Sequence, residues 1–195
     1  MPPLPHPPPR PVSLELAVDL LNSWDVLESP PELIRDASVL EGWLRRLGYT
    51  AAADAVSPED VPRLRAVRDR LRGAFEAAEE EEAVAILNGV VREWVAVPQL
   101  VRGVDGAWAF AHAVSPRTAS EAVAPISALA LLEVIREGGW NRFGVCDAAP
   151  CRCVYVDRSR NHTRRYCCEL CADRMTQAAY RRRKKDAPAP GPAHD

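Results

Sequence analysis

Six cysteines lie between positions 146 and 171 of this 195-residue chain, which has none elsewhere. A tetrahedral zinc site needs four thiolate or imidazole ligands, usually supplied as two close pairs. Cys146-x4-Cys151 and Cys167-x3-Cys171 are two such pairs. Clustered cysteines in a reducing compartment are more often metal ligands than disulfides. The spacing therefore predicts one Zn²⁺ per chain, bound by Cys146, Cys151, Cys167 and Cys171.

Other pairings of the cysteines remain open from spacing alone. Cys168 also forms a C-x2-C pair with Cys171, and Cys153 lies two residues after Cys151. His162 is either a further ligand or a surface histidine that faces phosphate. The two surplus thiols are either redox-sensitive groups beside the metal or small buried apolar residues.

The residues around the cysteines predict a small folded module. Residues 154–156 and 163–166 suit two short strands joined by a turn at 157–161, and good helix formers begin at Cys171. A knuckle, a hairpin and a ligand-bearing helix together predict a treble-clef-like zinc finger. A segment with so small a hydrophobic core needs a structural metal ion to fold, whether or not it binds a partner.

Charge is divided unevenly along the chain. Residues 1–139 carry 13 Arg against 21 Asp and Glu, a net charge of −8, whereas residues 140–185 have a net charge of +8. Arginine contacts guanine edges and phosphates, and glutamine pairs with adenine. The basic segment therefore predicts DNA contacts, with candidates Arg158, Arg160, Asn161, Arg164, Arg165, Arg174, Gln177, Arg181, Arg182 and Lys185.

Two other interpretations of the basic segment remain. Arg181 to Lys185 could be a solvated helix end favoured by the helix dipole, or the finger could dock onto the acidic first part of the chain. RNA is a weaker expectation than DNA, because no aromatic stacking platform is evident.

The segment before the finger has mainly helical periodicity. Helices are expected from Ser13, from a capping box that begins at Ser38, from Ser57-Pro58, over 83–91, and from Thr118 to about Glu137. Strand-like residues at 94–97 and 100–101, a turn at 103–106 and alternation over 107–114 predict one β-hairpin. The expected fold class is thus α+β, mostly α: a helical domain with one hairpin, plus the zinc finger.

These patterns divide the chain into four expected parts. They are a disordered Pro-rich segment (1–12), a helical regulatory or ligand-sensing domain (13–137), the finger with its basic helix (140–185) and a disordered tail (186–195). Asp19 and Asn22, three residues apart on the first helix, could contact a small-molecule effector or bond backbone groups at a buried helix end.

Several function classes are excluded by what the sequence does not contain. It shows no nucleophile-elbow, HExxH, Walker A or Rossmann glycine pattern, and a four-thiolate zinc site is closed and structural. No apolar run approaches the ~20 residues of a membrane span. The expectation is a cytoplasmic protein that is not an enzyme and does not contact a membrane.

The cysteine segment resembles a known family, the CGNR zinc finger of bacterial stress-induced transcription regulators. Its C-x4-C pair matches Cys146 and Cys151, its D-x-S-[RK]-N segment matches residues 157–161, and its second pair matches Cys167 and Cys171. The resemblance implies that Cys167 is a ligand and that Cys168 takes the family's serine position.

Two departures from the family pattern stand beside these matches. Ala172 replaces a glycine and Asp173 replaces an asparagine. A carboxylate at 173 would repel a base or phosphate that the family asparagine contacted.

The first part of the chain is similar to the ABATE-type domain that precedes this finger. LAVDLLNSWD resembles the family's L-A-L-D-F-V-N-T, and LEGWLRRLG resembles its L-x-x-W-L segment. The resemblance implies a transcription regulator with an N-terminal ligand-sensing domain. Together with the basic segment, it predicts a zinc-dependent DNA-binding regulator whose N-terminal domain senses a signal or mediates association. Because a single finger reads few base pairs, a homodimer or another partner is a further expectation. The alternative is a zinc-stapled protein-interaction module without direct DNA binding.

Overall fold

The computed structural model describes residues 12–94, 99–102, 106, 108–111 and 116–186. Seven α-helices lie within these residues: α1 (Val12–Leu21), α2 (Ala37–Arg46), α3 (Thr50–Asp54), α4 (Asp60–Glu76), α5 (Glu80–Glu93), α6 (Ala119–Gly138) and α7 (Glu169–Asp186). Two antiparallel hairpins pair β1 (Gln99–Arg102) with β2 (Trp108–Ala111), and β3 (Phe143–Val145) with β4 (Val154–Val156). The predicted fold class, mostly helical with a hairpin and a small C-terminal finger, is confirmed.

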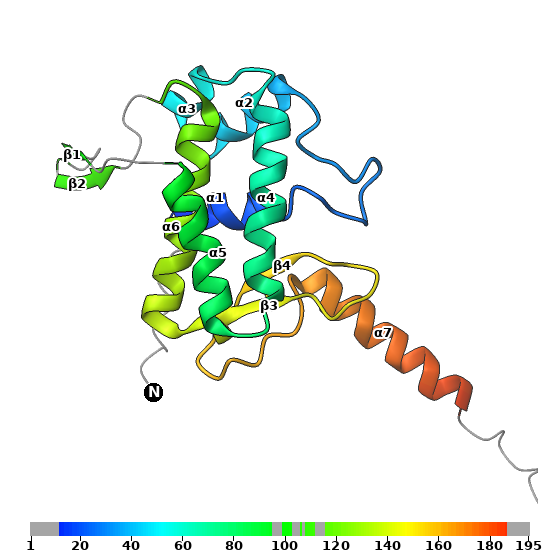
Figure 1. Ribbon diagram of the computed structural model, residues 1–195. Helices are drawn as coiled ribbons and strands as arrows, with labels where there is room; N and C mark the ends of the chain where they lie inside the picture. Colours follow the sequence, from blue (N-terminus) through cyan, green and yellow to red (C-terminus); the bar gives the residue numbers. More distant parts are fainter. Residues whose placement is uncertain (1–11, 95–98, 103–105, 107, 112–115, 187–195) are drawn as a thin grey trace, which may run out of the picture.

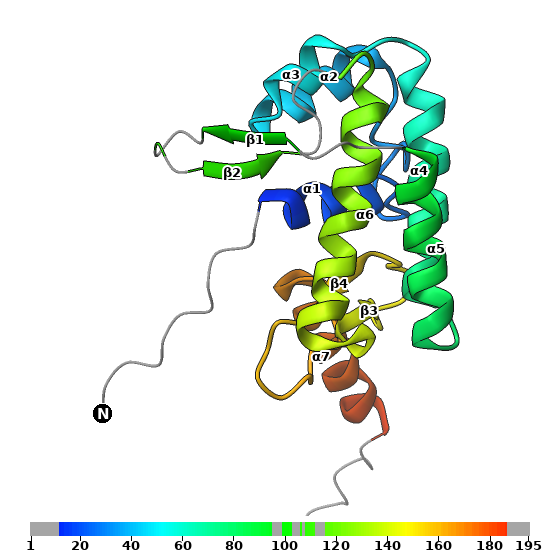
Figure 2. The same cartoon turned by 60° about the vertical axis from the view of Figure 1, so that its left-hand side comes forward.

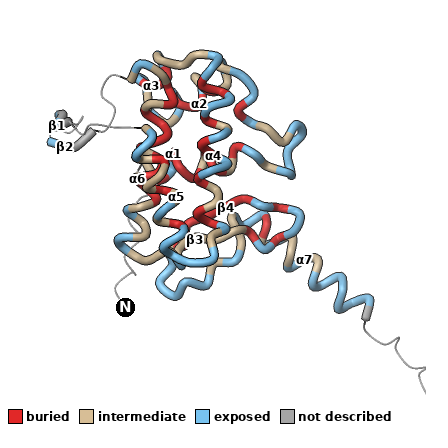
Figure 3. Tube along the Cα trace, viewed as in Figure 1, coloured by how far each residue is buried: buried red, intermediate tan, exposed pale blue. Residues whose placement is uncertain are grey.

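The helices form one bundle with the finger at its end. Helices α4, α5 and α6 run side by side, and α1 crosses them, while α2 and α3 cover the end opposite the finger (Figures 1 and 2). Every leucine of α1 is buried, and its side chains pack with those of α4 and α6 in one core. Figure 3 shows these buried segments facing inward, whereas the distal part of α7 is exposed throughout.

Local capping and charge explain where three helices begin. Thr118 caps α6, as predicted, by accepting a hydrogen bond from the backbone N–H of Glu121 at 3.3 Å. The predicted capping box at Ser38 was displaced by two residues, because Asp36 is the N-cap of α2 and accepts from the N–H of Val39 at 2.9 Å. The acidic run at 79–82 opens α5, where carboxylates complement the positive end of the helix dipole.

The β1–β2 hairpin was predicted, with longer strands than the described residues show. Gln99 pairs with Ala111 and Arg102 with Trp108, and the hairpin stands away from the bundle (Figure 2). Trp94, expected in the first strand, instead caps the C-terminus of α5. Residues 95–98, 103–105, 107 and 112–115 lie outside the described residues, as do the Pro-rich start and the tail that were expected to be disordered.

The second hairpin differs from the prediction in its pairing. Strand β4 was expected to pair with residues 163–166, but those residues form no strand, and β4 pairs instead with β3, which precedes the first cysteine. Glycine at 144 makes this possible, because it lies opposite Tyr155, whose ring leaves no room for a side chain.

The β3–β4 hairpin shares the core of the helical bundle. Val154 and Val156 are buried in the same apolar cluster as the helices, and Phe143 stacks on Phe75 of α4 with ring centroids 4.3 Å apart. The indole N–H of Trp140 donates to the backbone carbonyl of Ala74 at 3.1 Å. The finger is therefore packed onto the bundle rather than joined to it by a free linker.

Candidate metal centre and basic surface

Two chain segments bring the predicted ligands together. The backbone N–H of Cys146 donates to the carbonyl of Cys153 at 2.9 Å, which extends the β3–β4 hairpin to the first ligand, and a turn then positions Cys151. Cys167 lies two residues before α7, and Cys171 lies in its first turn. The hairpin thus supplies one pair of thiols and the start of α7 supplies the other.

The four sulfur atoms have the spacing of a tetrahedral site. The Sγ atoms of Cys146, Cys151, Cys167 and Cys171 all lie within 4.8 Å of one another. Cys167 Sγ is 3.7 Å from both Cys151 Sγ and Cys171 Sγ. Four sulfurs at a Zn–S distance of 2.3 Å would be separated by about 3.8 Å along each tetrahedral edge. Three of these residues are buried and the fourth is half-buried, so the cluster fits one Zn²⁺.

The protein environment acts differently on the individual thiols. Burial among the other sulfurs raises the pKa of Cys167, and burial raises the pKa of Cys171 to about 12. Burial also opposes ionisation of Cys146, but hydrogen bonds to its sulfur outweigh that effect and lower its pKa. One of them comes from the backbone N–H of Cys167, whose nitrogen lies 3.4 Å from Cys146 Sγ. Backbone donors of this kind support thiolate ligands.

The surplus thiols and the histidine lie outside the four-sulfur group. Cys168 is exposed, and its sulfur is 3.8 Å from that of Cys167. Cys153 is buried, and burial raises the pKa of its thiol. His162 is exposed in the turn, with a left-handed φ of 51°. The pairing that spacing left open is thereby decided for Cys167 over Cys168.

A buried aspartate organises the basic turn after β4. The carboxylate of Asp157 accepts hydrogen bonds from the backbone N–H of Ser159 at 2.7 Å and of Arg164 at 2.9 Å. Burial opposes its charge, but these hydrogen bonds outweigh burial and lower its pKa. Arg142 donates to the carbonyls of Asp157 and Ser159 from the other side. The sequence predicted a turn that begins at Asp157, as the Asp-x-Ser pattern indicates, but it did not single out Arg142.

The predicted DNA contacts divide into two groups by exposure. Arg164 is half-buried over the Tyr155 ring and donates to the carbonyls of Tyr166 and Cys167. Arg174 donates to the carbonyl of Ala148 at 2.5 Å and so ties α7 to the knuckle. Arg158 is also half-buried, and the remaining candidates are exposed, namely Arg160, Asn161, Arg165, Gln177, Arg181, Arg182 and Lys185.

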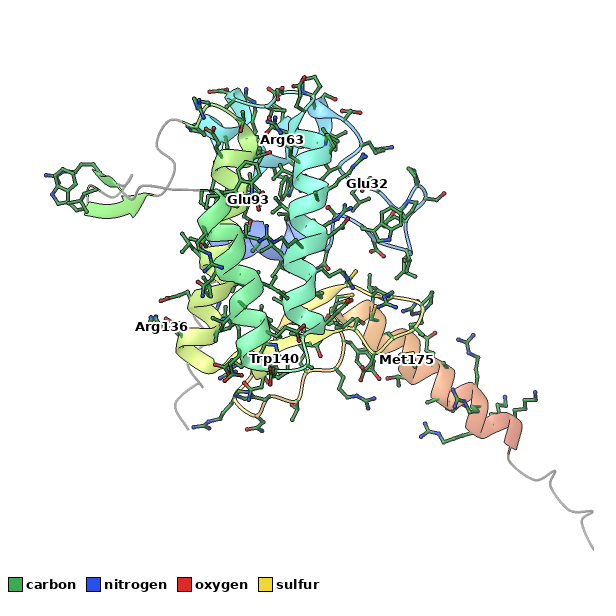
Figure 4. All side chains as sticks on the ribbon, viewed as in Figure 1. Glu32, Arg63, Glu93, Arg136, Trp140 and Met175 are labelled. Atoms are coloured by element: carbon green, nitrogen blue, oxygen red, sulfur yellow. The ribbon has the colours of Figure 1, made fainter. Side chains whose placement is uncertain are left out.

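Helix α7 leaves the body of the protein after its first turns. Cys171 belongs to the cysteine cluster and Met175 packs against it, and Figure 4 shows Met175 on the part of α7 nearest the body. Ala179, about one turn after Met175, is exposed, as are residues 180–185. The basic end of the helix therefore projects away from the body of the protein into solvent (Figure 1).

Asp19 and Asn22 both line a cavity beside α2. Asn22 also bonds the finger: its side-chain N–H donates to the carbonyl of Val154 at 3.0 Å, and its side-chain oxygen accepts from the Val154 N–H at 2.8 Å. Sequence reasoning foresaw a bond to backbone groups as one alternative, but not that the backbone belongs to β4.

A helical bundle that carries a compact four-cysteine finger defines a zinc-finger protein, and comparisons with known families agree. A family model described as "Putative stress-induced transcription regulator", ABATE, matches residues 14–138, and the CGNR zinc finger model matches residues 142–184. The chain belongs to the ABATE family and carries a C-terminal CGNR zinc finger, as the resemblance implied. Neither description is of an enzyme. A search of curated proteins gave no match.

None of the helices in the described part of the chain combines the length and apolar character needed to cross a bilayer.

Proposed function

We propose that this protein is a zinc-dependent DNA-binding transcription regulator whose finger contacts DNA through the turn at 158–165 and the exposed end of α7. The observation that carries the proposal is the solvent-exposed basic end of α7, anchored at its other end by the four-sulfur cluster. Arg160 and Arg165 are exposed on the turn, next to the cluster in sequence and structure. Arg181, Arg182 and Lys185 extend the positive charge along the helix.

The structure suggests different roles for the basic residues within this proposal. Arg164 and Arg174 already donate to backbone carbonyls of the finger, so we assign them to positioning the turn and the helix. The exposed residues are assigned to DNA: Arg160, Asn161, Arg165, Gln177, Arg181, Arg182 and Lys185. Arg158 is the first residue of the turn, and we include it as a phosphate contact.

Binding to random duplex DNA across a salt series tests the proposal. Each phosphate contact adds about 0.9 to the negative log–log salt slope. Replacing Arg181, Arg182 and Lys185 together with glutamine should weaken binding and lower the slope by about 2–3. The control replaces three exposed arginines of the bundle, Arg63, Arg92 and Arg117, and should leave the slope unchanged. Equal slopes for the two triple variants would refute the proposal.

A second candidate function is a zinc-stapled protein-interaction module. Leu170, in the first turn of α7, has 80% of its surface exposed, and Tyr180 has 61%. A protein partner that docks on α7 would cover both side chains and remove their apolar surface from water. Zinc-loaded protein that does not bind DNA even at low salt would favour this function over the first.

A further inference from the structure

One thiol beside the metal centre is open to solvent. All six cysteines lie in the described part of the chain, and of these only Cys168 is exposed. Its sulfur is 3.8 Å from that of Cys167, one of the four candidate zinc ligands. Cys153, the other thiol outside the four-sulfur group, is buried. Because oxidation of a thiol depends on its exposure, an oxidant from solvent reaches Cys168 first.

Cys168 also lies at the start of α7, where it forms the N-cap. Its backbone carbonyl accepts a hydrogen bond from the N–H of Ala172 at 3.3 Å, and the helix begins at the next residue. The side chain of an N-cap residue reaches toward the third residue of the helix, which here is Cys171. Residues three apart on a helix have Cα atoms about 5 Å apart, within the usual disulfide range of about 4.4–6.8 Å. Cys168 and Cys171 can therefore form a disulfide without a large movement of the backbone.

Cys167 is closer to Cys168 in sequence but is the less suitable disulfide partner. Consecutive Cα atoms are about 3.8 Å apart, below the separation usual for a disulfide. The sulfur of Cys167 lies 3.7 Å from that of Cys171, as expected for two ligands of one metal ion. Cys171 thus has two alternative partners, the metal that it shares with Cys167 and the exposed thiol of Cys168, and it cannot bind both.

We propose that Cys168 is a site of oxidation by hydrogen peroxide and that it then forms a disulfide with the zinc ligand Cys171. In the first step the Cys168 sulfur attacks a peroxide oxygen, the O–O bond breaks, and water leaves, so that the thiol becomes a sulfenic acid. In the second step the Cys171 sulfur forms an S–S bond to Cys168, the S–O bond breaks, and hydroxide leaves and takes up a proton. Two thiols and one hydrogen peroxide thus give one disulfide and two molecules of water.

The disulfide removes Cys171 from the metal centre. Three thiols of the group then remain for the metal, fewer than the four ligands of a closed structural zinc site. Cys171 also belongs to the first turn of α7, so its loss as a ligand weakens the attachment of the basic helix to the finger. The release of zinc does not depend on the proposed function, whereas the accompanying loss of DNA binding rests on it.

Treatment of the zinc-loaded chain with hydrogen peroxide tests the site. An equimolar amount should release zinc to a colorimetric chelator and protect two of the six thiols from alkylation in denaturant. Trypsin releases residues 166–174 as one peptide, which contains Cys167, Cys168 and Cys171. Fragmentation of this peptide should find Cys167 alkylated and Cys168 linked to Cys171. A bond between Cys167 and Cys168, or zinc release while the Cys168 thiol stays free, would overturn the proposal.

Two variants compare the thiols that are not ligands. Cys168→Ser should release zinc at least about tenfold more slowly than the wild type at the same peroxide concentration, because sensitivity follows exposure and the remaining thiols are shielded. Cys153→Ala is the matched control and should release zinc at the wild-type rate, because its thiol is buried. Zinc content and circular dichroism before treatment check that both variants are folded. Equal rates for Cys168→Ser and the wild type would contradict the assignment.

Reduction tests whether the oxidised product is a disulfide. Dithiothreitol with added Zn²⁺ should restore one zinc per chain and the affinity for DNA, whereas a sulfinic or sulfonic acid would not be reduced. Zinc binding that is not recovered would therefore contradict the disulfide. If peroxide forms the bond between Cys168 and Cys171 in a chain that binds no DNA before or after treatment, the oxidation site stands while the proposed function fails.

Discussion

At the scale of the residue, two adjacent cysteines have different surroundings. Cys167 Sγ belongs to the tetrahedral group, whereas Cys168 is exposed beside it. Cys167→Ser should therefore abolish stoichiometric zinc binding, because a hydroxyl is a poor zinc ligand and leaves three thiolates. Cys168→Ser should retain one zinc per chain. Metal content after dialysis measures both, and loss of zinc from the Cys168 variant would contradict the assignment.

Asp60 is a buried residue on which two helices depend. Its carboxylate accepts from the N–H and hydroxyl of Ser120 at the start of α6, and from the N–H and hydroxyl of Ser57 before α4. Burial opposes the charge, but the four hydrogen bonds outweigh it and lower the pKa of Asp60 below 3.8. The stabilisation is therefore present above the unfolded pKa and is lost as the pH falls through the folded one.

Asp60→Asn should lower the free energy of unfolding by about 1–3 kcal/mol at neutral pH, because an amide cannot accept at both positions. The variant should also lose less stability than the wild type when the pH falls below about 4. Urea unfolding at several pH values measures both effects. Asp54→Asn, which removes one partner of an exposed ion pair, is the control and should lower the free energy of unfolding by less than about 1 kcal/mol. If Asp60→Asn and the wild type lose stability equally as the pH falls, the prediction is contradicted.

At the scale of the element, the β3–β4 hairpin depends on close contact between Gly144 and Tyr155. A Cβ at position 144 would lie 2.6 Å from the Tyr155 hydroxyl oxygen. That hydroxyl donates to the carbonyl of Arg164 at 2.6 Å and so ties the hairpin to the basic turn. Displacement of the Tyr155 ring would weaken both the β3–β4 hairpin and its link to the basic turn.

Gly144→Ala should therefore destabilise the protein by about 1–3 kcal/mol, the usual cost of overpacking. Gly42→Ala is the control, because nothing lies within 4 Å of a Cβ there. Because position 42 lies in the middle of α2, this alanine should raise the free energy of unfolding by up to about 1 kcal/mol. Thermal unfolding compares the two substitutions, and equal effects would show that Tyr155 is not held as described.

At the scale of the whole molecule, the bundle and the finger share one core. Val154 and Val156 of the finger are buried with the bundle helices, and Asn22 and Trp140 bond across the junction. We therefore expect the bundle and the finger to unfold together.

Removing zinc with a chelator should lower the melting temperature of the entire chain, by about 2–4 °C for each kcal/mol of lost stability. Calorimetry with and without chelator measures this shift, and a single transition is expected in both samples. A separate bundle transition at an unchanged temperature would mean that the finger is energetically independent.

Much of this protein was determined by local sequence. The two cysteine pairs, the Thr118 cap and the basic segment depend on spacing, capping and composition, which act over a few residues. For this reason the zinc ligands, the start of α6 and the fold class could be predicted, and the ABATE and CGNR resemblances followed from the same short patterns.

Only the tertiary structure decided which residues meet across the chain. The pairing of β4 with β3, the bond from Asn22 to Val154 and the contacts of Arg174 join residues that periodicity cannot relate. The physical reason is that the buried hairpin satisfies its backbone hydrogen bonds and covers its valines only against the bundle. Helical pattern predicts which face of α1 is apolar, but not which strand lies against it.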